Sequence, residues 1–162
     1  GMSVWDPVSQ RVLVNVQTRN QIAAIDPHSL KIVARVVLPS TCQHNHGLLV
    51  DAADKLAFVA CDGNAKLLAL SLPDLKPVQA PLELGNDPDV LALDASRHRL
   101  VVAAESGVVA LFAITSGHLQ PLWRGLVGPN AHVVAIDPST GNLYFPLKAL
   151  DGHPAVRIMR WQ

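Results

Sequence analysis

Histidine and aspartate side chains recur at one position relative to an aspartate that follows a short apolar run. Each lies five residues before that aspartate: His46 before Asp51, Asp89 before Asp94 and His132 before Asp137. Two imidazoles and a carboxylate that converge on one point suit a divalent metal with open coordination positions, which activates water or polarises an oxygen. Metal-assisted hydrolysis by these three residues is therefore one candidate chemistry, with the metal as its only cofactor.

Further polar residues stand close to these positions in the sequence. His44, Asp87 and Asn130 lie two residues earlier, in the stretches "HNHG", "DPDV" and "NAHV". The same groups suit a small organic ligand or a protein partner. They are also common turn formers, so polar turns without any ligand are an equally physical interpretation.

The elements that must position these residues come from a fourfold internal repeat. Aspartates at 6, 51, 94 and 137 are spaced by 45, 43 and 43 residues. The aligned units are "VWDPVSQRVLVNV", "LLVDAADKLAFVA", "LALDASRHRLVVA" and "VAIDPSTGNLYFP". A period of 43 to 45 residues is typical of stacked or radial repeat folds.

Within each unit the apolar pieces are short, rich in Val, Ile, Leu and Ala, and bounded by turn residues, which predicts strands. The expected strands are 3–5, 11–16, 21–25 and 31–38; 46–50, 55–60, 66–71 and 76–80; 89–93, 99–104, 108–114 and 119–123; and 132–136, 142–147 and 154–160. Four antiparallel strands per unit predict an all-β chain of β-propeller blades, about four in number, with the last one incomplete. The expected single domain, 1–162, divides into repeats at approximately 3–45, 46–88, 89–131 and 132–161.

A propeller would bring the polar positions together, because the first strand of each blade lines the central channel. The loop after the second strand lies on the same face, and there we align Gln17, Cys61, Glu105 and Lys148. Glu105 is a candidate fourth ligand or general base, or else a solvated carboxylate.

The stretches "DPVSQRVLVNVQTRNQIAAIDPHSLKIVARVVLP" and "VAIDPSTGNLYFPL" resemble the YVTN-type repeat of bacterial YVTN/NHL-like propeller proteins. The resemblance implies the fold and covers nearly the whole chain. Members are mostly bacterial and often exported, and many have no assigned activity. The YVTN tetrapeptide itself is degenerate here, with "LVNV", "AFVA", "VVAA" and "YFPL" in its place.

Cys42 enters the second unit and Cys61 follows that unit's second strand, so both are expected on one face. They either form a disulfide, in an oxidising compartment, or remain free thiols. The first residues lack a charged region followed by an apolar one, so no signal peptide is predicted as the chain is given. We expect a periplasmic or extracellular location if residues precede it, and a cytoplasmic one otherwise.

Composition narrows the classes of partner. Thirteen basic and thirteen acidic residues cancel, and no basic run is present, which argues against nucleic acid. The longest apolar stretch, "VVALFAI", is far shorter than the ~18 residues of a membrane span. Four blades leave flat faces uncovered, so we expect a homo-oligomer or part of a larger ring, and a free-standing four-bladed ring is the remaining alternative.

Two functions follow from this sequence. The first is a binding or scaffold protein with a polar site at the channel mouth. The residues expected to form this site are His44, His46, Asp87, Asp89, Asn130, His132 and Glu105. The second is a metal-assisted hydrolase of the lactonase type that some propellers host, using His46, Asp89 and His132. A non-enzymatic function is favoured, because no complete catalytic constellation is visible.

Overall fold

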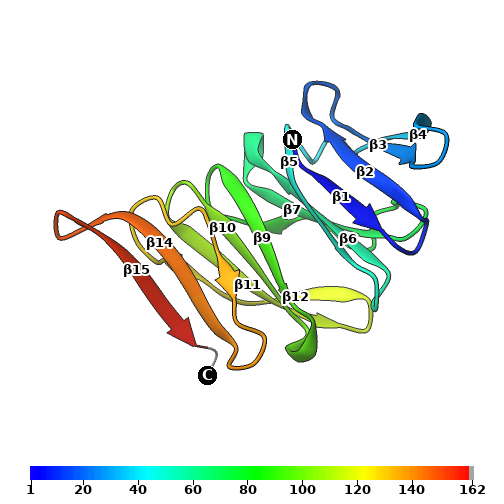
Figure 1. Ribbon diagram of the computed structural model, residues 1–162. Helices are drawn as coiled ribbons and strands as arrows, with labels where there is room; N and C mark the ends of the chain where they lie inside the picture. The colour runs from blue at the N-terminus through cyan, green and yellow to red at the C-terminus, as the bar shows by residue number, and fades with distance from the viewer. Residues whose placement is uncertain (161–162) are drawn as a thin grey trace.

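The computed structural model describes residues 1–160, which form four antiparallel sheets (Figure 1). The first contains β1 (Ser3–Asp6), β2 (Arg11–Val16), β3 (Gln21–Asp26) and β4 (Lys31–Val37). The second contains β5 (Asn45–Asp51), β6 (Leu56–Cys61), β7 (Lys66–Ser71) and β8 (Leu82–Glu83). The third contains β9 (Pro88–Asp94), β10 (Arg99–Ala104), β11 (Val108–Thr115) and β12 (His118–Leu126). The last has three strands, β13 (Ala135–Ile136), β14 (Asn142–Leu150) and β15 (His153–Arg160).

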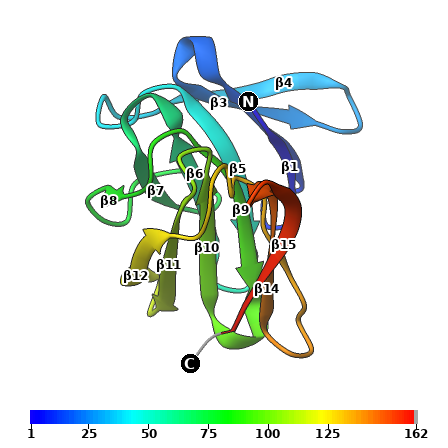
Figure 2. The same cartoon turned by 90° about the vertical axis from the view of Figure 1, so that its left-hand side faces the viewer.

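The predicted all-β propeller fold is confirmed, and each sheet is one blade of it. The blades follow one another in chain order along an open arc (Figure 1). Their first strands lie on its inside, with β1 next to β5, β5 next to β9 and β9 next to β13 (Figure 2). This order brings the segments that carry the candidate polar residues to neighbouring positions. Single 3₁₀ turns follow β2, β6 and β9, at Gln17–Arg19, Asp62–Asn64 and Ala95–Arg97.

Two strands differ from the sequence-based expectation, and proline explains both. In the second blade Pro77 makes only an isolated bridge with Leu70, and the strand expected at 76–80 forms instead at β8. Pro77 lies within this stretch and Pro81 directly follows it, and neither can donate to a ladder. In the last blade β13 is confined to two residues; two positions further along its register, Val133 would face Pro146 of β14, which has no N–H to donate to the ladder.

The core consists of three layers between successive blades, built by the alternation of side chains along each strand. In β6, Leu56 and Phe58 pack toward the third blade, whereas Ala57 and Val59 pack toward the first. The middle blades are thus buried on both faces, which explains their continuous apolar runs. At about 25 cal/mol per Å² of buried apolar surface, this layering is the main stabilising term.

The two end blades have faces that no further blade covers. Trp5 and Val37 are 48% and 74% exposed on the first blade. Val156 and Ile158 are 59% and 60% exposed on the last. Among residues 1–160 there is no helix with the length and apolar character of a membrane span.

The repeat aspartates fix the turn between the first two strands of each blade. Asp51 and Asp94 are buried, and their carboxylates accept hydrogen bonds from backbone N–H groups two or three residues later. Burial raises the pKa of the Asp94 carboxyl, but hydrogen bonds from Ser96 and Arg97 outweigh it, so that this pKa lies below its usual value. The aspartate that recurs in the sequence therefore caps the turn between the first two strands of a blade.

Candidate functional site

His46 and Asp89 meet across the interface between the second and third blades. His46 Nε2 lies 3.3 Å from Asp89 Oδ1, and the two residues belong to the adjacent inner strands β5 and β9. Gly47 makes this approach possible, because a Cβ there would lie 2.4 Å from Leu91 Cδ1 and 2.7 Å from the Asp89 carbonyl oxygen. The glycine after His46 thus permits the close packing of two blades at the site.

A second carboxylate, Asp62, approaches His46 from the turn after β6. Its Oδ2 lies 4.0 Å from His46 Nδ1, and its Oδ1 lies 3.8 Å from Nδ1 of the exposed His44. Gln17 Nε2 of the first blade donates a 2.9 Å hydrogen bond to Asp62 Oδ2 and so holds this carboxylate in place. The His46 ring consequently lies between carboxylates of two blades.

These groups surround a cavity of about 270 Å³ on the channel face. The side chains that can bind a ligand there are one imidazole and four carboxylates, those of His46, Asp62, Asp87, Asp89 and Glu105. His46 Nδ1 is buried and has no hydrogen-bond partner within residues 1–160. Since buried polar atoms are normally satisfied, this nitrogen is a position where a ligand or a water molecule completes the hydrogen bonding.

A buried amide network supports His46 from the side of the first blade. Asn45 Nδ2 donates to Asn15 Oδ1 at 2.8 Å and to the Gln21 carbonyl oxygen at 3.0 Å. Asn15 Nδ2 in turn donates to the carbonyl oxygens of His46 and Gly47, at 2.9 and 3.0 Å. Both asparagines are buried, so the backbone that carries His46 is fixed by interactions inside the protein.

His44, Asp87 and Asn130 are equivalent in the structure, as their spacing predicts. All three have left-handed backbone conformations, with φ values of 53°, 54° and 56°, just before the segment that leads into a first strand. Asp87 lines the cavity, whereas His44 lies at its edge beside Asp62. A left-handed turn favours a polar residue at this position in the second, third and fourth repeats.

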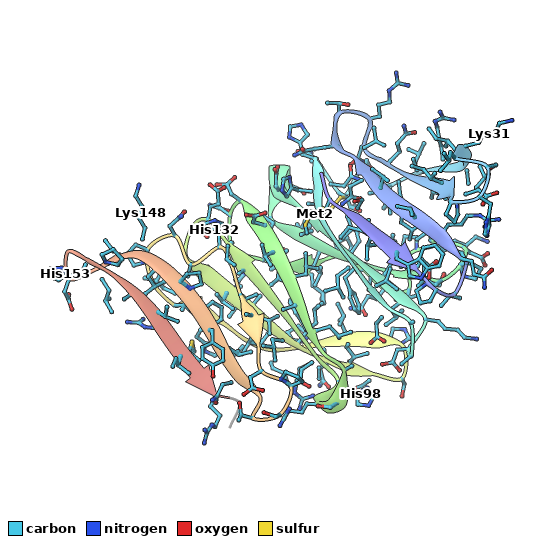
Figure 3. All side chains as sticks on the ribbon, viewed as in Figure 1. Met2, Lys31, His98, His132, Lys148 and His153 are labelled. Atoms are coloured by element: carbon cyan, nitrogen blue, oxygen red, sulfur yellow. A yellow bond between two sulfur atoms is a disulfide. The ribbon has the colours of Figure 1, made fainter. Side chains whose placement is uncertain are left out.

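His132 does not join His46 and Asp89. His132, which is labelled in Figure 3, belongs to the segment before β13. Its Nδ1 lies 2.9 Å from the Asn130 carbonyl oxygen and 3.0 Å from Asn130 Nδ2. Neither His132 nor Asn130 lines the cavity. Across residues 1–160, no three His, Cys, Asp or Glu side chains are arranged to hold a metal ion. The expected metal set of His46, Asp89 and His132 is therefore not assembled.

Asp62 lines the cavity and is the residue that the sequence alignment of loops missed. Its backbone N–H donates to the His44 carbonyl oxygen, as that of Glu105 donates to the Asp87 carbonyl oxygen, so Asp62 and not Cys61 is equivalent to Glu105. The signal was present: Asp62 and Glu105 each stand eleven residues after a repeat aspartate, whereas Cys61 stands ten after.

Cys42 and Cys61 are joined by a disulfide, with Cα atoms 5.3 Å apart. Both cysteines are buried in the core layer between the first two blades. The bond ties the loop before β5 to the end of β6, next to Asp62. It therefore anchors both segments that carry His46 and Asp62.

Comparison with known proteins gives a likeness in structure only. No protein-family model and no curated protein matches the chain, so the YVTN-type resemblance stays a prediction. The hydrazine synthase of Kuenenia stuttgartiensis is 11% identical with a TM-score of 0.81, over 98% of this chain and 45% of that one. A "putative 6-phosphogluconolactonase" from Bacteroides uniformis is 14% identical with a TM-score of 0.77, over 97% of this chain and 57% of that one. Another "putative 6-phosphogluconolactonase", from Bacteroides fragilis, is 16% identical with a TM-score of 0.76, over 91% of this chain and 47% of that one.

The chain thus spans about half the length of the structures that it matches. Identities this low support a shared fold and leave the activity open. What the comparisons show is a β-propeller architecture, whose neighbours include proteins of the 6-phosphogluconolactonase kind.

Proposed function

We propose that this chain is a binding protein whose channel-face cavity holds a small organic cation. The observation that carries the proposal is the convergence of Asp62, Asp87, Asp89 and Glu105 with His46 on one cavity that no lysine or arginine lines. Carboxylates only accept hydrogen bonds, and an ammonium group only donates them, so the two are complementary.

The size of the cavity limits the ligand. Its volume of about 270 Å³ lies below the ~300–1,000 Å³ of sites for drug-sized molecules, so a short amine fits better than a large one. The half-exposed carboxylates make the affinity depend on salt, because screening weakens attraction between charges at a surface.

Calorimetric titration with 1,4-diaminobutane tests the proposal, and 1,4-butanediol serves as its uncharged analogue. We expect the diamine to bind and the diol not to bind. Asp62→Asn/Asp89→Asn should lose the heat of binding, whereas Asp74→Asn, an exposed aspartate outside the cavity, should retain it. Equal binding of diamine and diol, or full binding by the double variant, would refute the proposal.

Hydrolysis of a lactone in the same cavity is a second candidate, favoured by the descriptions of two structural neighbours. A histidine beside a carboxylate, as in the His46–Asp89 pair, is suited to take a proton from water. Four carboxylates would repel a phosphate group, so an uncharged lactone is the substrate to assay. Release of acid from glucono-1,5-lactone that His46→Gln abolishes would support this candidate, and an unchanged rate would exclude it.

The two uncovered end faces lead to a proposal about assembly. They pack against further blades, supplied by a second copy of the chain or by further residues of the same protein. Exposed apolar side chains on both faces support this, as does the coverage of about half of each neighbouring structure. Light scattering that shows only monomers of the 162-residue chain at micromolar concentration would exclude the second copy.

A further inference from the structure

A second pocket, of about 530 Å³, lies on the channel face between the first and second blades. Its walls are the 3₁₀ turn after β2 and the loop that leads into β5. In contrast to the channel-face cavity, no carboxylate is among the described residues that line it. Side chains that can donate hydrogen bonds there include those of Gln17, Thr18, Arg19, Ser40, Gln43 and His44.

This pocket is the counterpart of the channel-face cavity, one blade earlier. Gln17 and Asp62 each stand eleven residues after a repeat aspartate, and His44 and Asp87 each stand seven residues before one. Gln17 and His44 line the pocket, as Asp62 and Asp87 line the cavity. The repeat thus builds the same recess twice, and a glutamine and a histidine replace two aspartates in the first of them.

Arg19 gives the pocket a positive charge. Its side chain is exposed, and among residues 1–160 its guanidinium group has no carboxylate within 4.0 Å and no hydrogen-bond partner. Asn64 holds the equivalent position one blade later, so the positive charge belongs to this recess and not to the cavity. A guanidinium group without a partner, next to further donors, is suited to bind a carboxylate.

Both walls of the pocket are fixed by interactions within the protein. Asn20 closes the turn after β2 in a left-handed conformation, with φ of 48°. On the other wall the disulfide ties the loop to the end of β6, and the Gln43 N–H donates to Asn64 Oδ1 at 3.2 Å. A site that is held in this way loses little entropy when a ligand binds.

The pocket also contains an unfilled polar position. Asn20 Oδ1 is buried and has no hydrogen-bond partner within residues 1–160, as is the case for His46 Nδ1 in the cavity. A water molecule that donates to Asn20 Oδ1 would satisfy this atom and leave Arg19 free for a ligand.

The pocket and the cavity meet at Asp62. Gln17, which lines the pocket, donates to Asp62 Oδ2 at 2.9 Å. His44, which also lines the pocket, has its Nδ1 3.8 Å from Asp62 Oδ1. The carboxylates of the cavity and the guanidinium group of Arg19 are therefore presented in neighbouring recesses of one face.

We propose that the ligand of this face is a zwitterion, an amino acid with its amino and carboxylate groups at opposite ends. The cavity binds the ammonium group, and Arg19 binds the carboxylate in the neighbouring pocket. This inference rests on the proposed cation site and adds to it a second site of opposite charge. A diamine that is short enough to lie within the cavity still binds, but it gains nothing from Arg19.

Two matched pairs of ligands test the proposal by calorimetric titration: 4-aminobutanoate with 4-aminobutanamide, and 6-aminohexanoate with 6-aminohexanamide. Within a pair the ammonium group and the chain length are the same, and only the far end changes from charged to neutral. The four carboxylates of the cavity repel another carboxylate, so without the Arg19 site the amide would bind at least as tightly as the acid. We expect the acid to bind at least ~5-fold more tightly than its amide at one length or both.

Two variants locate the preference for the acid. Arg19→Gln should abolish it and leave the affinity for the amide unchanged. Arg35→Gln, the same change on exposed β4 of the same blade, should alter neither affinity. Circular dichroism confirms that each variant is folded.

The outcomes separate this inference from the cation site on which it rests. Amides that bind without any preference for the acids overturn the inference and leave the cation site standing. No binding of acids or amides at ~10 mM overturns both. A preference for the acid that persists in Arg19→Gln, or that Arg35→Gln removes equally, shows that Arg19 does not bind the carboxylate and overturns the inference.

Discussion

The Cys42–Cys61 disulfide should provide a large part of the stability of the chain, and its removal gives a quantitative test. The cysteines are 19 residues apart, and the loop-closure entropy for that separation corresponds to about 3 kcal/mol at 25 °C. Both sulfur atoms lie in a core layer, so Cys42→Ala/Cys61→Ala introduces no buried polar group. We therefore expect the double variant to lose about 3 kcal/mol of unfolding free energy, which is large against the ~5–15 kcal/mol of a typical domain.

Urea unfolding followed by circular dichroism measures this difference, with and without a reducing agent. Reduction should lower the stability of the wild type toward that of the variant and leave the variant unchanged. A loss of less than ~1 kcal/mol, or a variant that still responds to reduction, would refute the loop-closure reasoning.

Three further results are expected. Gly47→Ala should cost about 1–3 kcal/mol in urea unfolding, because its Cβ would meet Leu91 and the Asp89 carbonyl oxygen; an unchanged midpoint would contradict this packing. Asn45→Ala should cost about 1–3 kcal/mol, since it leaves Asn15 Oδ1 and the Gln21 carbonyl oxygen without their donor; a neutral effect would argue against the buried network. Hydrogen bonds from the Thr140 and Ser139 hydroxyls lower the pKa of Asp137 from 3.8 to about 2. Its contribution to stability is therefore complete above pH 3.8 and lost as the pH falls through about 2, and Asp137→Asn should flatten this part of a melting-temperature profile.

The fold was predictable because its periodic signals are local. Asp51 and Asp94 cap their own turns, and the apolar runs between such turns have the length of strands. The failures came from pairing partners that lie elsewhere in the chain. Prolines limit the extent of β8 and β13. Pro146 lies in β14, so its effect on Val133 depends on how β13 and β14 pair, which the residues of β13 alone do not reveal.

The site was predictable in part for the same reason. Repeat spacing placed His46 and Asp89 on adjacent blades, and the two side chains meet. It also placed His132 at an equivalent position, but the open arc and the local contacts of His132 with Asn130 keep it out of the cavity. Asp62 was missed by a register error of one residue, which in a strand or tight turn changes the direction of a side chain.

The measurement that tests the central claim most directly is a map of amide chemical shifts during titration with 1,4-diaminobutane. The account predicts saturable shifts confined to the segments that line the cavity, around residues 44–47, 61–63, 87–90 and 104–106, and the loss of those shifts in Asp62→Asn/Asp89→Asn. Shifts that are absent, that do not saturate, or that centre on other segments would contradict it.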